Sequence, residues 1–193
     1  YVGFSEDGVG RLRLRNGRWE EEGIGEEVEG RAYRVAEDSK GEIWVGTGSS
    51  GIYRLAWPAS SFAPTTIAKL DTTDGLPAPT FNFAVQMGRE VRFITQAGLY
   101  RFDETTRRFR PDSTFASVYA DSITIGWPVE GHTPGEVWMD FGGHKFGVAQ
   151  RHPDGGYVWR ERSFRRLADY GDVNGIYPDG DSLMWASTPE GVL

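Results

Sequence analysis

Short apolar runs separated by glycine-containing turns follow one another along this chain. In one stretch, Ile43–Val45 lies between Gly41 and Gly46, and after a Gly/Ser turn comes a second run, Ile52–Leu55. Apolar runs of this length, bounded by Gly and Ser, are typical of short β-strands joined by turns. Few segments show the 3.6-residue period of an amphipathic helix. The pattern therefore predicts an all-β protein.

The same stretch recurs with altered residues, and its marker position falls at Tyr1, Trp44, Arg92, Trp138 and Trp185. The spacing between markers is 43 to 48 residues, which is typical of propeller blades. We therefore predict that residues 1–193 form a single β-propeller region of about four blades, each of four antiparallel strands. Since the first and last copies are incomplete, the region is expected to be a fragment of a larger propeller.

The strands of individual blades can be assigned from the same pattern. Asn16-Gly17 between two strand-like runs predicts a tight hairpin, because both turn positions require positive φ. One complete blade is predicted at residues 31–36, 44–45, 52–55 and 66–70, and the next at 80–86, 92–94, 99–102 and 107–110. A third is predicted to begin with an inner strand at 121–125 and to carry extra loop residues at 127–134 and 141–146.

Composition and charge exclude several classes of function. The formal net charge of −7 disfavours nucleic acid, whose affinity comes largely from Lys and Arg that neutralise phosphates, and it disfavours an anionic membrane surface. The absence of cysteine excludes disulfides, thiolate zinc sites and cysteine nucleophiles. No apolar run approaches the ~20 residues that a membrane-spanning helix needs, so neither a membrane span nor a signal peptide is expected within these residues.

Three segments carry a family resemblance: Asp38–Thr47 followed by Gly51–Arg54, the sequence Asp-Gly-Leu-Pro at 74–77, and Leu183–Leu193. On these segments the chain resembles the two-component regulator propeller family. The resemblance implies the sensor ectodomain of a bacterial hybrid histidine kinase or related regulator, with a periplasmic or extracellular location. It also implies more blades than four and a linked membrane and kinase domain.

Candidates for catalysis or metal binding are weak. His132 and His144 lie in loops of one repeat and could bind a metal or transfer protons, but neither has a carboxylate at motif spacing, which favours exposed turn residues. Asp38 and Asp179-Gly180-Asp181 resemble calcium ligands, yet they fall where turns require Asp and Gly. No G-x-S-x-G, phosphate loop or HExxH motif is present. No catalytic residue, metal site or cofactor is therefore predicted.

A ligand site is better supported at the rim of the central channel, where the inner strands of a propeller begin. Alignment of the repeats on the Trp44 position places seven residues there, of aromatic, amide and charged types. They are Arg31, Tyr33, Phe81, Asn82, Asp121, Asp172 and Asn174. Such a mixture suits an oligosaccharide or another small polar ligand. The alternative that these residues only satisfy strand ends in a narrow channel remains open.

The sequence thus favours an extracytoplasmic ligand-sensing module of a two-component signalling protein, binding a glycan or another polar nutrient and having no enzymatic activity. One alternative is a propeller lyase or glycoside hydrolase that uses a loop histidine and rim carboxylates. A second alternative is a structural platform for protein docking or homodimerisation.

Overall fold

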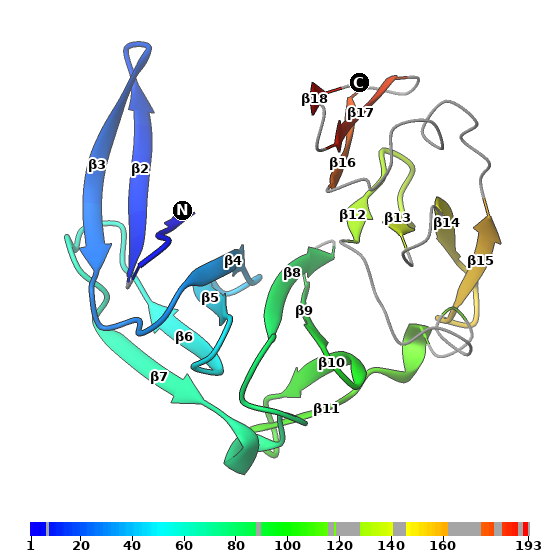
Figure 1. Cartoon of the computed structure of the whole chain (residues 1–193), viewed down its shortest axis with the longest axis horizontal. Coiled ribbons are helices and arrows are strands. Elements are labelled where there is room, and N and C mark those ends of the chain that lie inside the picture. Colours follow the sequence, from blue (N-terminus) through cyan, green and yellow to red (C-terminus); the bar gives the residue numbers. More distant parts are fainter. Residues whose placement is uncertain are drawn as a thin grey trace. The chain divides into compact units, whose positions relative to one another are not determined.

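The computed structural model describes residues 1–6, 8–87, 90–115, 118, 128–140, 146–161, 175–179, 183–188 and 191–192. The described strands form five small antiparallel sheets of three, four, four, four and three strands (Figure 1). The chain divides into two compact units, 1–111 and 112–193. Among the described residues, no helix is both long enough and apolar enough to span a bilayer. The predicted all-β propeller class is confirmed.

The first sheet is dominated by a long hairpin. Its strands are β1 (Val2–Gly3), β2 (Val9–Arg15) and β3 (Arg18–Gly25), in that order. Asn16 and Gly17 join β2 to β3 with φ values of 50° and 76°. This turn is the predicted one, since only residues that tolerate positive φ can occupy both positions.

The second and third sheets are complete four-stranded blades. The second contains β4 (Ala32–Glu37), β5 (Glu42–Thr47), β6 (Ile52–Ala56) and β7 (Thr66–Leu70). After a 3₁₀ turn (Thr72–Asp74), the third contains β8 (Phe83–Met87), β9 (Glu90–Thr95), β10 (Gly98–Asp103) and β11 (Arg108–Pro111). Strand β4 contacts β8 as well as β1, so the first strands of neighbouring sheets adjoin.

The core of the first unit lies between its sheets, because each blade has two apolar faces. On β5, Trp44 faces the third sheet and packs in a cluster with Phe93 and Phe109. Its neighbours Ile43 and Val45 face the other way, into a cluster that includes Val9 of the first sheet. A strand that is buried on both faces requires a neighbour on each side, which is why such sheets stack.

The second unit holds the other two sheets. After a 3₁₀ turn (Ser113–Phe115), the fourth sheet has the order β12 (Val129–Glu130), β13 (Glu136–Asp140), β14 (Phe146–Arg151) and β15 (Tyr157–Glu161). The fifth has the order β16 (Gly175–Asp179), β17 (Leu183–Thr188) and β18 (Gly191–Val192).

One strand of the fourth sheet differs from the prediction. The predicted inner strand at 121–125 lies outside the described residues, and β12 pairs with β13 instead. Strand β12 comes from residues 127–134, which were predicted to be an extra loop. Val129 pairs with Trp138 and packs with it against Ile176 and Ala186. The ladder pairing and the partial burial of this valine explain why a short segment between Pro128 and the Gly131 turn is extended.

Candidate functional site: an aromatic platform at the ends of β4 and β8

Three aromatic side chains meet where β4 and β8 begin. The ring centroids of Tyr33 and Phe83 are 5.5 Å apart at an interplanar angle of 80°, and those of Phe81 and Phe83 are 6.4 Å apart at 66°. Tyr33 is 43% exposed and Phe81 is 52% exposed. We call these three residues the aromatic platform. Large apolar side chains that remain exposed next to one another often mark a binding surface.

Two backbone irregularities present the platform to solvent. A shift of register in the β4–β5 pairing between Ala32 and Arg34 leaves Tyr33 outside the ladder. Such bulges change the direction of a side chain and are frequent beside functional sites. Phe81 has a φ of 55°, in the left-handed region, which costs an aromatic residue about 1–2 kcal/mol. Strain of this kind persists where the surrounding structure enforces it, and it often accompanies a functional site.

Gly48 connects the two halves of the platform. Its N–H donates to the carbonyl of Arg31 at 3.3 Å, and its own carbonyl accepts from the N–H of Phe81 at 3.1 Å. A β-carbon at this position would lie 2.6 Å from the Tyr33 ring. A larger residue at this position would therefore displace the Tyr33 ring.

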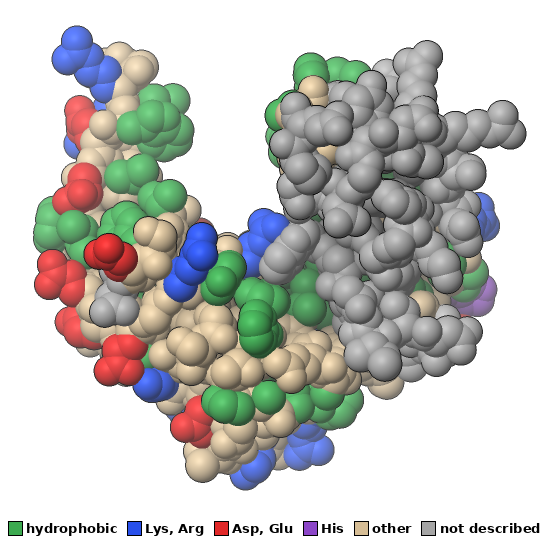
Figure 2. Space-filling view, viewed as in Figure 1, with side chains coloured by type: hydrophobic (Ala, Val, Ile, Leu, Met, Phe, Trp, Pro, Cys, Tyr) green, Lys and Arg blue, Asp and Glu red, His purple; other side chains and the backbone are tan. Residues whose placement is uncertain are grey.

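Arg31 adds a positive charge beside the platform. Its guanidinium carbon lies 4.9 Å from the centroid of the Tyr33 ring, within the range of a cation–π contact. The residue is exposed, and within the described part of the chain its guanidinium has no carboxylate partner. On the face of the first unit that Figure 2 shows, some hydrophobic side chains lie next to basic ones.

The predicted rim residues are thus placed differently from one another. Arg31, Tyr33 and Phe81 come together at the surface, whereas Asn82 is completely buried beneath them. The Asn82 amide donates to the Ala78 carbonyl at 2.9 Å, while its buried Oδ1 has no hydrogen-bond partner among the residues that the structure describes. In this position Asn82 supports the segment that carries the platform. The other three predicted residues, Asp121, Asp172 and Asn174, lie outside the described residues.

The sequence interpretation missed Phe83 and Gly48. Phe83 follows Phe81 by two residues, so a strand beginning at 80 would place both on one face. Gly48 belongs to a run of Gly and Ser that was assigned only to a turn. Nothing in the sequence signals that its backbone also binds the segment before β8.

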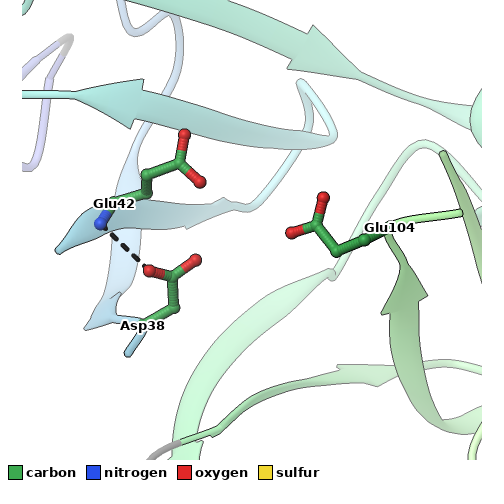
Figure 3. A group of neighbouring side chains, drawn as sticks. All are labelled: Asp38, Glu42 and Glu104. Carbon is green, nitrogen blue, oxygen red and sulfur yellow. Dashed lines mark hydrogen bonds between the residues drawn. The ribbon is translucent and has the colours of Figure 1, made fainter. Parts of the chain in front are cut away.

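A separate, acidic cluster lies between the second and third sheets, where Asp38, Glu42 and Glu104 approach one another (Figure 3). Carboxylate oxygens of the three lie within 4.8 Å, a spacing that a metal ion could bridge. Cationic side chains already occupy the cluster, however. The Arg54 guanidinium donates to Glu42 Oε2 at 2.9 Å and to Glu104 Oε1 at 2.7 Å, and Lys40 Nζ lies 3.0 Å from Glu104 Oε1.

These contacts make the cluster an ion-pair bridge between sheets. The hydrogen bond from Arg54 is the largest cause that holds the pKa of Glu104 below its ordinary value. The Arg54 guanidinium also lies 4.7 Å from the centroid of the Trp44 ring. Arg54 and Lys40 thus offset most of the negative charge of the three carboxylates, and Arg54 continues the packing between sheets.

The calcium-like aspartates have a structural partner instead. Asp38 Oδ2 accepts from the indole N–H of Trp44 at 3.0 Å, and Asp179 Oδ2 accepts from that of Trp185 at 3.0 Å. Asp181 lies outside the described residues. The spacing of six residues between Asp and Trp is a sequence signal for this pair, and the sequence interpretation did not use it.

The candidate histidines do not form a site in the described structure. His132 lies exposed in the turn between β12 and β13, with no carboxylate partner in the part of the chain that is described. His144 lies outside the described residues. The described residues therefore do not test the alternative, disfavoured by the sequence, of a site that uses both histidines.

Comparison with known proteins supports the fold. Residues 28–49 match the family model described as "Two component regulator propeller". No curated protein sequence matches the chain. The match at residues 28–49 confirms, for that repeat, the family resemblance found in the sequence.

Solved structures with the same architecture include two extracellular domains from B. thetaiotaomicron. One is described as belonging to the hybrid two component system BT4673, with 18% identity and a TM-score of 0.54; the match covers 95% of this chain and 25% of that chain. The other is described as belonging to the hybrid two component system BT3049, with 17% identity, a TM-score of 0.51, and coverage of 98% of this chain and 27% of that chain. The chain therefore spans about a quarter of their length, and at this identity the likeness shows the fold.

Proposed function

We propose that this chain, which carries a two-component regulator propeller repeat at residues 28–49, is a ligand-binding part of the extracytoplasmic sensor of a two-component signalling protein. The similar solved structures, described as extracellular domains of such systems, support a periplasmic or extracellular sensing role. A linked membrane and kinase domain belongs to the same proposal. The module acts by binding and has no catalytic role.

The aromatic platform is the observation that carries this proposal. Tyr33 and Phe81 are exposed, and an irregular backbone at both residues presents them to solvent. Sugar rings have apolar C–H faces beside polar hydroxyls, so they stack on aromatic side chains while neighbouring polar groups bind the hydroxyls. Arg31 and the Tyr33 hydroxyl supply such groups. We therefore propose an oligosaccharide as the ligand.

Isothermal titration calorimetry with a panel of neutral and acidic oligosaccharides tests this function. We expect binding of at least one oligosaccharide, and a loss of about tenfold or more in affinity for Phe81→Ala, which corresponds to ~1.4 kcal/mol. Phe62→Ala is the matched control, because Phe62 is also an exposed phenylalanine, at 63%, but lies in the loop between β6 and β7. Absence of binding by the folded chain across the panel, or equal affinities for Phe81→Ala and wild type, would contradict the proposal.

Homodimerisation is a second candidate function, favoured by the β2–β3 hairpin. Leu12, Leu14 and Trp19 are 39%, 54% and 69% exposed. Leu14 and Trp19 pair directly across the strands, so they share one face of the hairpin. The opposite face carries ion pairs, including Arg13 to Glu22 at 2.8 Å. A second copy of the chain that packs on the apolar face would remove these side chains from water.

Light scattering over a concentration series tests the dimer. We expect a mass that rises towards that of a dimer for wild type and stays at that of a monomer for Trp19→Ser. A wild-type chain that remains monomeric at the highest concentration would contradict this second function and leave the binding function intact.

A further inference from the structure

We infer that the ligand of the aromatic platform carries an anionic group, a carboxylate or a sulfate, next to the sugar ring that stacks on Phe81, and that Arg31 binds this group. The inference rests on the proposed function and makes it more specific. The ligand class becomes an acidic oligosaccharide rather than a neutral one.

Arg31 presents a guanidinium that no carboxylate of the described residues neutralises. The guanidinium is held over the Tyr33 ring, 4.9 Å from the centroid. The contrast with Arg54 is direct, because the Arg54 guanidinium lies over the Trp44 ring at 4.7 Å but also binds Glu42 and Glu104. A guanidinium that rests on an aromatic face keeps its N–H groups available, and two of them match the geometry of a carboxylate or sulfate.

A second feature is the position of Arg31 relative to the stacking surface. Gly48 is hydrogen-bonded to the backbones of both Arg31 and Phe81, so a single residue separates the two segments. Tyr33, with no hydrogen-bond partner for its hydroxyl among the described residues, lies in contact with Arg31 and with Phe83. A sugar ring on Phe81 therefore places its substituents near the guanidinium and the phenolic hydroxyl.

The charge of the whole chain opposes an anionic ligand, and the exposed position of Arg31 sets the expected salt dependence. A net charge of −7 repels an anionic ligand at long range. An exposed cation that is held in place at the platform offsets this repulsion locally. Binding through Arg31 should accordingly weaken with added salt, since exposed charges are screened within about 10 Å at 0.1 M ionic strength.

Three matched probes separate this inference from the proposed function. They are tri-galacturonic acid, its carboxyl-reduced neutral counterpart, and a sulfated form of that neutral trisaccharide, each titrated calorimetrically into the whole chain. We expect one or both acidic probes to bind about tenfold or more tightly than the neutral one, as a charge-assisted bidentate contact implies. The acidic probe that binds identifies the anionic group.

Variants at Arg31 complete the test. Arg31→Gln should remove the preference for the acidic probes, and Arg31→Lys should keep part of it, because a lysine retains the charge but not the planar fork. Arg18→Gln is the matched control, since Arg18 is an exposed arginine at the hairpin tip, away from β4. Near-ultraviolet circular dichroism verifies that each variant is folded.

The outcomes distinguish the two claims. Equal affinities for neutral and acidic probes, unchanged in Arg31→Gln, would overturn the role of Arg31 while the platform remained a sugar-binding site. No binding of any probe or of the wider panel by the folded chain would overturn the proposed function itself. An acidic preference that survives in Arg31→Gln would likewise overturn the inference.

Discussion

The second sheet, β4–β7, and the fifth sheet, β16–β18, contain the same local hydrogen bonds in different surroundings. In both, the indole N–H of the central tryptophan donates to an aspartate six residues earlier, at 3.0 Å. In both, a threonine at the end of the second strand donates to the carbonyl of a glycine at or just before the start of the third, from Thr47 to Gly51 at 2.8 Å and from Thr188 to Gly191 at 3.2 Å.

The two central tryptophans differ in burial, although both sheets contain the same hydrogen bonds. Trp44 is 2% exposed and makes ring contacts with Phe93, Phe102 and Phe109 of the third sheet. Trp185 is 43% exposed. The repeat sequence therefore determines the hydrogen bonds within a blade. The neighbouring sheet determines how much the tryptophan stabilises the fold. Buried aromatic contacts contribute far more than exposed ones.

Truncation of the two tryptophans should give the largest difference. Trp44→Ala removes a buried ring from the layer between sheets and should reduce the free energy of unfolding by ~3–5 kcal/mol. Trp185→Ala removes a partly exposed ring and should cost about 1 kcal/mol. Urea denaturation followed by circular dichroism measures both. Equal costs would show that Trp185 is as buried in solution as Trp44.

The turn glycines should give the next largest difference. Gly51 has a φ of 80°, and a β-carbon there would lie 2.4 Å from the carbonyl oxygen of Leu70 on β7. Gly191 also has positive φ, at 145°, but no atom of the described residues lies within 4 Å of its β-carbon position. We expect Gly51→Ala to cost about 2–3 kcal/mol and Gly191→Ala about 1 kcal/mol, since only the first adds a collision to the backbone strain. Thermal unfolding of both variants provides the measurement; the reverse order would refute the role of β7.

Removal of the aspartates should have a smaller effect. Asp38→Ala leaves the indole N–H of a buried tryptophan without an acceptor, and it also removes the acceptor of the Lys40 and Glu42 N–H groups. We expect a loss of about 1–2 kcal/mol. In Asp179→Ala the exposed indole can bind water, so the loss should stay below ~0.5 kcal/mol. Similar losses in urea denaturation would indicate that the two indoles are equally shielded from water.

The smallest expected effect is the loss of folding stability when Asp38 is protonated at low pH. Burial raises the pKa of Asp38, but the hydrogen bonds from Trp44, Glu42 and Lys40 more than offset this, so the pKa lies below the ordinary value of 3.8. The charged form therefore stabilises the fold above pH 3.8, and this contribution is lost as the pH falls through the lowered pKa.

The matched variant for that measurement is Asp38→Asn, which cannot titrate. The stability difference between wild type and Asp38→Asn should be constant near neutral pH and should shrink below pH 3.8. The other carboxylates titrate in both proteins, so their contributions cancel when the stability of Asp38→Asn is subtracted from that of wild type. A difference that grows on acidification would show that Asp38 is not stabilised as the charged form.

The sequence predicts the bounds of the first and last strands of the second sheet well. Residues 31–36 and 66–70 were predicted and are observed as β4 and β7 within one residue at each end. The predicted strand at 80–86 instead begins at Phe83, because the left-handed backbone at Phe81 interrupts it. A φ value of this kind for phenylalanine leaves no signal in an apolar pattern, since it is imposed by the hydrogen bond to Gly48.

The candidate site was predictable only in part, for a similar reason. Alignment of the repeats placed Arg31, Tyr33 and Phe81 at one end of their strands, and they do meet there. Alignment gives a position along a strand but not the direction of a side chain, so it did not reveal that Asn82 is buried. It also could not bring Glu104 to Asp38, since that contact joins two sheets.

The amino-acid sequence specifies the blade: its repeat length, its strands, its turn glycines and its family resemblance. These follow from local alternation and backbone preferences, which each repeat carries within its own residues. Which tryptophan is buried, and which aromatic residues stay exposed, depends on the packing of the sheets. Those properties depend on which sheet packs against which face and on hydrogen bonds between distant segments, and no single repeat encodes either.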